Sequence, residues 1–122
     1  MDNSLASEGP KLPTLIITGS SGLIGSSFID RVWQKYSEIG LDREGPPHPP
    51  PETQHVINCN LSSDDSVRAA LDGVRRLGHT RIASIIHLAA YYSFSGEPSP
   101  LYEQVTVLGT ERLLRELRSF DV

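Results

Sequence analysis

The sequence predicts an α/β fold in which a parallel, doubly wound sheet is covered by helices. Three observations lead to this prediction. The apolar run 15–17 passes directly into a glycine-rich turn, a helical pattern follows that turn, and strand-like and helix-like segments then alternate. Such alternation is typical of parallel strands joined by right-handed crossovers. We expect strands near residues 14–18, 38–42, 54–59 and 82–88, in the spatial order 3-2-1-4.

Apolar residues at helical spacing indicate the helices between these strands. The first helix follows the glycine-rich turn, with Ile24, Phe28, Val32 and Tyr36 four residues apart, and we expect it to end near Gly40. The buried faces expected for two further helices comprise Val67, Ala70, Leu71 and Val74 in one and Leu101, Val105, Gly109, Leu113 and Leu117 in the other. Each helix is therefore expected to present one apolar stripe to a sheet face.

Length and composition restrict the class of protein. The 122 residues contain no apolar run near the ~18 residues of a membrane span and no signal-peptide pattern, which favours one cytoplasmic domain without a membrane partner. The net charge of −4, with only Lys11 and Lys35 as lysines, argues against a nucleic-acid partner. The single Cys59 is expected to be a buried strand residue. Residues 1–12 are expected to form a flexible leader, and residues 13–122 the folded part.

The segment 18–25, TGSSGLIG, joins the first strand to the first helix. Gly19 suits a tight turn, Gly22 lets backbone N–H groups approach a phosphate, and Gly25 allows the helix to lie close to the sheet. This context indicates a cradle for the pyrophosphate of a dinucleotide, with a helix N-terminus facing the anion. The candidate contacts are Gly19, Ser21, Gly22, Leu23, Ile24 and Gly25. A Gly/Ser-rich turn without a ligand is the alternative.

Asp42 is a candidate ribose ligand at the end of the second expected strand, seventeen residues after Gly25. A carboxylate there can accept hydrogen bonds from the adenosine ribose and repels a 2′-phosphate, which favours NAD over NADP. Arg43 leaves NADP possible, because its guanidinium could pair with that phosphate or lie over the adenine. The alternative for this pair is a solvated charged turn.

Five segments in this order resemble the extended short-chain dehydrogenase/reductases of the NAD-dependent epimerase/dehydratase family. They are 18–25 (TGSSGLIG), 40–43 (GLDR), 60–62 (NLS), 86–90 (IHLAA) and 107–110 (VLGT). The resemblance covers residues 13–122 and implies a Rossmann-type fold, of which the chain would hold the first four strands. It also implies an NAD cofactor and oxidoreductase, epimerase or dehydratase activity on a nucleotide-sugar-like or other hydroxyl-bearing substrate.

The resemblance implies further cofactor contacts. In the family, the residue matching Asn60 is usually an aspartate that accepts a hydrogen bond from the adenine amino group, with the backbone of the residue matching Leu61 beside it. The amide oxygen of Asn60 can still accept that bond. The residues matching Leu88, Ala89 and Ala90 line the cofactor where the fourth strand ends.

Three other features have both a functional and a structural interpretation. His87 is expected to be a hydrogen-bonded core histidine rather than a metal ligand, because no second ligand stands at suitable spacing. The aromatic and hydroxyl-rich loop 91–98 either faces a substrate or packs on the protein. The polyproline stretch 46–51 is expected to be a stiff exposed loop rather than an SH3-type ligand. Thr106 stands where the family often has an asparagine, so its contact is open.

The resemblance implies proton transfer by a Tyr with a Lys four residues later, and no Tyr in this sequence has that partner. We therefore expect no catalytic residue and no metal site in these 122 residues. We interpret the chain as the N-terminal part of a longer enzyme, for which a homodimer is possible. By itself it is expected to be poorly stable and catalytically inactive. The alternative is a complete, non-catalytic dinucleotide-binding or sensor module.

Overall fold

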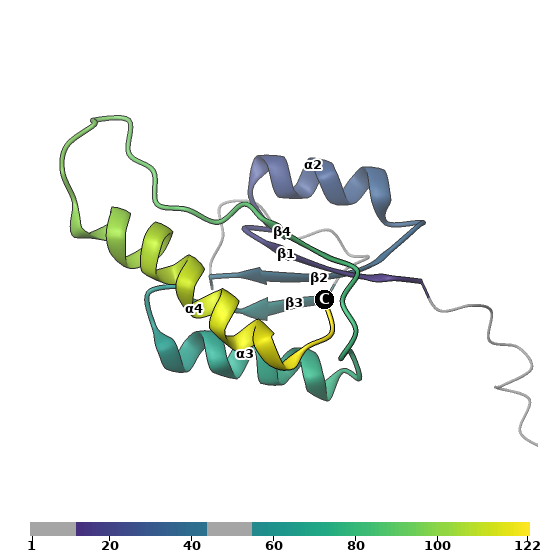
Figure 1. Cartoon of the computed structure of the whole chain (residues 1–122). Helices are drawn as coiled ribbons and strands as arrows, with labels where there is room; N and C mark the ends of the chain where they lie inside the picture. Colours follow the sequence, from purple (N-terminus) through teal and green to yellow (C-terminus); the bar gives the residue numbers. More distant parts are fainter. Residues whose placement is uncertain (1–11, 44–54) are drawn as a thin grey trace, which may run out of the picture.

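The computed structural model describes residues 12–43 and 55–122. Its strands are β1 (Thr14–Thr18), β2 (Ser37–Asp42), β3 (His55–Asn58) and β4 (Ser84–His87). They form one parallel sheet in the order β3-β2-β1-β4 (Figure 1), which confirms the order predicted from the sequence. The polyproline stretch 46–51 and residues 1–11 of the expected leader lie outside the described residues.

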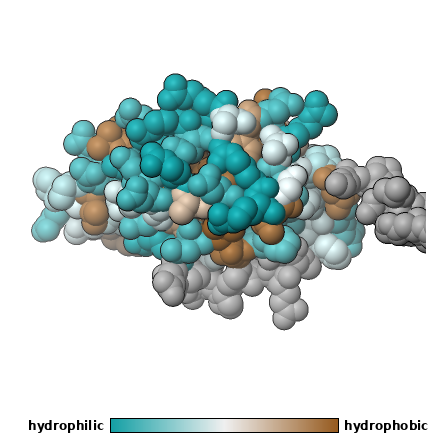
Figure 2. All heavy atoms as spheres, turned by 90° about the horizontal axis from the view of Figure 1, so that it is seen from below, coloured by the Kyte–Doolittle hydropathy of each residue, from teal (hydrophilic) through white to brown (hydrophobic). Residues whose placement is uncertain are grey.

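Helices cover both faces of the sheet. Helix α2 (Leu23–Val32) lies on one face, and α3 (Asp64–Arg76) and α4 (Leu108–Glu116) lie together on the other (Figure 1). A π-helical segment, η1 (Tyr102–Val107), leads into α4, and the short 3-10 helix η2 (Leu117–Ser119) follows it. Figure 2, which views the molecule from the side of α3, shows a mostly hydrophilic face with small, separate hydrophobic groups. The apolar faces of α3 and α4 are therefore turned inward.

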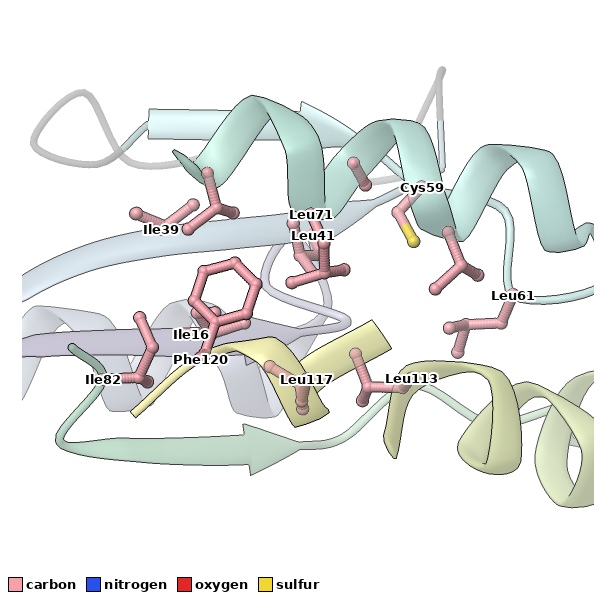
Figure 3. Close-up of a cluster of buried hydrophobic side chains, with 13 residues drawn as sticks. Ile16, Ile39, Leu41, Cys59, Leu61, Leu71, Ile82, Leu113, Leu117 and Phe120 are labelled. Atoms are coloured by element: carbon pink, nitrogen blue, oxygen red, sulfur yellow. The ribbon is translucent and has the colours of Figure 1, made fainter. Parts of the chain in front are cut away.

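The larger hydrophobic core lies between the sheet and the layer of α3 and α4 (Figure 3). Its buried members are Ile16, Ile39, Leu41, Cys59, Leu61, Val67, Ala70, Leu71, Val74, Ile82, Leu113, Leu117 and Phe120. The predicted buried face of α3 is confirmed in full. That of the last helix is confirmed except at Leu101, which is 42% exposed. Leu101 lies before η1 and borders a surface cavity instead of the core.

A smaller core, formed by Leu15, Ile17 and Ile29, lies between the sheet and α2. Most of the predicted apolar stripe is confirmed, because Ile29 is buried and Phe28, Val32 and Tyr36 pack, partly buried, against this core. The prediction is wrong at Ile24, which is 71% exposed.

The end of α2 also differs from the expected position. The helix ends at Val32, whereas Gly40 lies within β2. Ser37 already pairs with Thr14 of β1, and its N–H donates to the carbonyl of Pro13 at 2.8 Å. Pairing with the central strand therefore ends the helical pattern before Tyr36.

The residues after α4 return to the sheet. Phe120 packs into the larger core, and Asp121 forms an isolated parallel bridge with Arg81. The N–H of Ile82 donates to the carbonyl of Asp121 at 2.7 Å, and the N–H of Asp121 donates to the carbonyl of Thr80 at 2.9 Å. The segment before β4 is thereby held in place, although β4 itself is shorter than the predicted strand 82–88.

Glu38 is an ionisable residue buried near the start of β2. It is 3% exposed, and its Oε1 has no hydrogen-bond partner among the described residues. Burial raises the pKa of this carboxyl, and a hydrogen bond to its own backbone opposes the rise. The folded state therefore favours the protonated acid more than the unfolded state does.

We expect Glu38→Gln to raise the melting temperature near neutral pH. Protonation of Glu38 favours the folded state. This contribution to the free energy of unfolding is fully present below the unfolded pKa of 4.5 and is lost as pH rises through the higher folded pKa. An amide of the same shape carries no charge at either pH. Thermal melts of both proteins at about pH 4 and about pH 8 measure the effect. A gain that is equal at the two pH values would contradict this account.

Candidate functional site

A cavity of about 510 Å³ lies at the carboxyl ends of the strands. In parallel sheets of this kind, ligands bind at this edge. The predicted contacts that line the cavity are Gly19, Gly22, Asp42, Arg43, Asn60, Leu61, Leu88, Ala89 and Ala90. The other four predicted contacts do not line it, and Leu23 and Ile24 border a separate hollow on α2. Ser21 and Gly25 are buried, whereas Leu23 and Ile24 are 73% and 71% exposed at the start of α2.

Two glycines are required by the shape of the loop between β1 and α2. Gly19 has φ +67°, a left-handed conformation that side chains disfavour. Its N–H donates to the carbonyl of Leu41 at 3.0 Å, which ties the turn to β2. A Cβ at Gly25 would lie 2.5 Å from the oxygen of Gly19 and 2.9 Å from the Cα of Ser20. Helix α2 therefore begins in direct contact with the loop backbone.

Gly22 differs from these two glycines because its own backbone tolerates a side chain. It is extended, with φ −75° and ψ 176°. Among the described residues, a Cβ here would meet the oxygen of Gly19 at 3.4 Å, an ordinary contact. No side chain in the described part of the molecule caps α2 at this residue. The first-turn N–H groups of the helix are thus available to an anion beside the cavity.

The hydroxyl groups of Ser20 and Ser21 are the unusual polar groups of this loop. Both residues are fully buried, and neither Oγ has a hydrogen-bond partner among the described residues. Most buried polar groups in proteins are paired, so an orphaned group needs an explanation. Neither serine lines the cavity, so these hydroxyls lie behind the loop surface that borders it.

Asp42 connects the glycine loop to the end of β2. Its Oδ2 accepts a hydrogen bond from the N–H of Ser21 at 2.9 Å, and its Oδ1 accepts one from the N–H of Arg43 at 2.7 Å. A carboxylate oxygen has two lone pairs, so each oxygen can accept another bond. The carboxylate is therefore fixed in place and still able to bind hydroxyl groups in the cavity.

Asn60 forms a tight turn between β3 and α3. Its Oδ1 accepts hydrogen bonds from the N–H of Ser62 at 3.0 Å and from the Oγ of Ser62 at 2.7 Å. The N–H of Asn60 donates to the Oγ of Ser66 at 2.8 Å. The amide oxygen that was expected to accept a bond from adenine is thus already occupied.

A protein-family model matches nearly the whole chain. The model of the NAD dependent epimerase/dehydratase family matches residues 15–122. The chain belongs to this family. A search of curated proteins found no match.

Solved structures of epimerases and dehydrogenases share the fold. A putative epimerase from Burkholderia cenocepacia is 26% identical with a TM-score of 0.70, and the match covers 93% of this chain and 35% of that protein. The NAD complex of UDP-glucose 4-epimerase from Thermus thermophilus is 23% identical, with a TM-score of 0.69 and coverage of 86% and 33%. Uronate dehydrogenase from Agrobacterium tumefaciens is 20% identical, with a TM-score of 0.67 and coverage of 89% and 37%. The chain thus spans about a third of the length of these structures.

Thr18 is a residue of the site that was not predicted from the sequence of this member of the epimerase/dehydratase family. Its Oγ1 accepts hydrogen bonds from the N–H groups of Leu88 at 3.0 Å and Ala89 at 3.1 Å. With both lone pairs used, the hydroxyl donates its proton to Nδ1 of His87 at 2.6 Å. Thr18 therefore holds the segment after β4 against the end of β1, at the cavity wall. A hydroxyl at the last position of β1 was the available signal.

His87 is a hydrogen-bonded histidine, as predicted. Because Nδ1 accepts the bond from Thr18, the ring proton is on Nε2, which donates to the Oγ1 of Thr110 at 2.9 Å. Thr110 in turn donates to the carbonyl of Thr106 at 2.6 Å. Burial lowers the pKa of the His87 imidazole. Within residues 12–43 and 55–122, no group of three or more His, Cys, Asp or Glu side chains is placed to hold a metal ion.

The loop after β4 contributes aromatic side chains to the cavity, where Tyr91 and Tyr92 form part of the lining. The N–H of Tyr91 donates to the Oγ1 of Thr106 at 2.9 Å, and its ring makes an edge contact with Tyr102 at 4.8 Å. Thr106 thus anchors the loop to η1. Phe94, by contrast, is 94% exposed.

Two further observations limit the chemistry of the described residues. Cys59 is buried, as predicted, although it lies directly after β3 and not within a strand. Burial together with the charge of Asp42 raises the pKa of its thiol to about 11. A thiol with this pKa is almost entirely protonated near neutral pH and is a poor nucleophile. None of the helices in the described ranges has the length and apolar character needed to cross a membrane.

Proposed function

We propose that this chain binds NAD along the carboxyl edge of its sheet, as the dinucleotide-binding part of an epimerase/dehydratase-type oxidoreductase. The observation that carries the proposal is the glycine loop. Gly19 and Gly25 are fixed by the fold, whereas Gly22 leaves an open face beside the cavity and the helix N-terminus. Such a face suits the pyrophosphate of a dinucleotide.

The strand order gives the direction in which the adenosine half would extend. From the pyrophosphate at β1, the ribose would lie at the end of β2, where Asp42 has lone pairs to accept its hydroxyl groups. The base would lie beside Asn60 and Leu61 at the end of β3, with Arg43 at its edge. A charged acceptor at Asp42 favours NAD, because it repels the 2′-phosphate of NADP.

The nicotinamide half would extend the other way, along the segment after β4. Leu88, Ala89 and Ala90 line the cavity there, and Thr18 holds the backbone of Leu88 and Ala89. Small side chains allow a flat ring to lie close to the backbone. When bound, NAD accepts and returns a hydride. The adjacent Tyr91 and Tyr92 would face a nucleotide-sugar-like or other hydroxyl-bearing substrate.

The proposal that the reaction involves sugars rests on the relatives. UDP-glucose 4-epimerase and uronate dehydrogenase are named for sugar derivatives. No Tyr in these 122 residues is followed four positions later by the Lys that proton transfer would require. In a second candidate function, the chain binds NAD without turnover as a sensor module. Hydride exchange at saturating NAD, measured on the protein encoded by the whole reading frame, would separate the two candidates.

We expect Asp42→Ala to reduce the preference for NAD over NADP by about tenfold, since it removes both the ribose acceptor and the repulsion. Asp42→Asn is the matched control, because it keeps an oxygen for the N–H of Ser21 and removes the charge. Calorimetric titration with both dinucleotides measures the ratio of dissociation constants. Unchanged discrimination in Asp42→Ala would mean that Arg43 or another group selects the cofactor.

A further inference from the structure

The turn at Asn60 presents an unusual hydrogen-bonding surface to the cavity. Asn60 and Ser62 both border it at the carboxyl end of β3. The N–H of Ser62 can only donate, so the atom that it meets at 3.0 Å must be the amide oxygen. This obligate donor fixes which way the Asn60 amide is turned. The amide nitrogen, Nδ2, is therefore on the other side of the group.

The oxygen of Asn60 has no capacity left for a ligand. An amide oxygen has two lone pairs, and those of Asn60 are taken by the N–H and the hydroxyl of Ser62. Nδ2 makes no hydrogen bond with the described residues, and Asn60 is exposed. The side chain of this cavity-lining residue thus has two free N–H donors and no free acceptor.

We propose that Asn60 recognises the base of the bound dinucleotide as a hydrogen-bond donor. This inference rests on the proposed binding of NAD and concerns which purines the site admits. A donor can pair with N1 of adenine or with O6 of hypoxanthine, because both are acceptors on the same edge of the base. It cannot pair with the 6-amino group of adenine, which is itself a donor. The site therefore accepts a 6-keto purine as readily as a 6-amino purine.

Binding of NAD and of nicotinamide hypoxanthine dinucleotide, measured by calorimetry on the whole chain, tests the proposal. The wild type is expected to bind the two with dissociation constants within about threefold of each other. Asn60→Asp keeps an oxygen for both bonds from Ser62 and replaces Nδ2 with a second acceptor. This variant is expected to favour NAD by about tenfold, because a charged acceptor pairs with the amino group.

Ser62→Ala provides a second variant that leaves residue 60 unchanged. Loss of the Ser62 hydroxyl frees one lone pair of the Asn60 oxygen, so a shift of about threefold toward NAD is expected. A wild type that prefers NAD by tenfold or more would overturn the inference and leave NAD binding intact. Equal ratios in all three proteins would also overturn it. Binding of neither dinucleotide by the wild type would overturn the proposed function and this inference together.

Discussion

Gly25→Val is expected to destabilise the fold by about 3 kcal/mol or more. The new Cβ would lie 2.5 Å from the oxygen of Gly19 and 2.9 Å from the Cα and the oxygen of Ser20. All three are backbone atoms, so no side chain can rotate to make room. Either α2 must move away from the sheet or the glycine loop must change shape. Chemical denaturation of the variant and the wild type measures the loss in free energy of unfolding.

Gly22→Val is the matched control for this prediction. It adds the same side chain three residues earlier, where the first new atom meets the oxygen of Gly19 at 3.4 Å. The backbone at Gly22 is extended, a conformation that valine adopts readily. We expect its free energy of unfolding to change by less than about 1 kcal/mol. Equal destabilisation by the two substitutions would show that close contact with the loop is not the cause.

Thr18→Val is the second substitution with a large expected effect. Valine has the shape of threonine but removes the hydroxyl that serves His87, Leu88 and Ala89. The N–H of Leu88 keeps a bond to the carbonyl of Thr18 at 3.2 Å, whereas Nδ1 of His87 and the N–H of Ala89 lose their partner. Leaving these groups unpaired is expected to cost roughly 2–4 kcal/mol.

Thr18→Ser separates the hydroxyl from the methyl group. It retains all three hydrogen bonds and loses one methyl, for which we expect a cost of about 1 kcal/mol. Thermal and chemical denaturation of both variants gives the comparison. A Thr18→Val protein as stable as Thr18→Ser would show that the hydroxyl network does not hold the segment after β4.

The sheet was predictable because its signals are local. The run Leu15 to Ile17 and the apolar segment before Leu88 mark strands, and alternation with helices requires parallel crossovers. The position of the cavity was predictable from this strand order, since parallel strands bring the residues at their carboxyl ends to one edge of the sheet. Asp42 and Asn60 are therefore neighbours of the glycine loop although they are distant in sequence.

Features that depend on tertiary contacts were not predictable from the sequence. The end of α2 was placed near Gly40 because apolar spacing continues to Tyr36, but pairing of Ser37 with β1 ends the helix earlier. The network around Thr18 joins residues about 70 positions apart. Occupation of the Asn60 oxygen depends on a side-chain rotamer, which spacing does not reveal.

Calorimetric titration of NAD into the wild-type chain and into Gly22→Val tests the central claim most directly. We expect saturable binding of one NAD per wild-type chain. In Gly22→Val, affinity should fall by tenfold or more, because the side chain would occupy the open face of the glycine loop. The thermal melts of the two proteins without ligand should stay close. No binding to the wild type, or equal affinity in both proteins, would contradict the account.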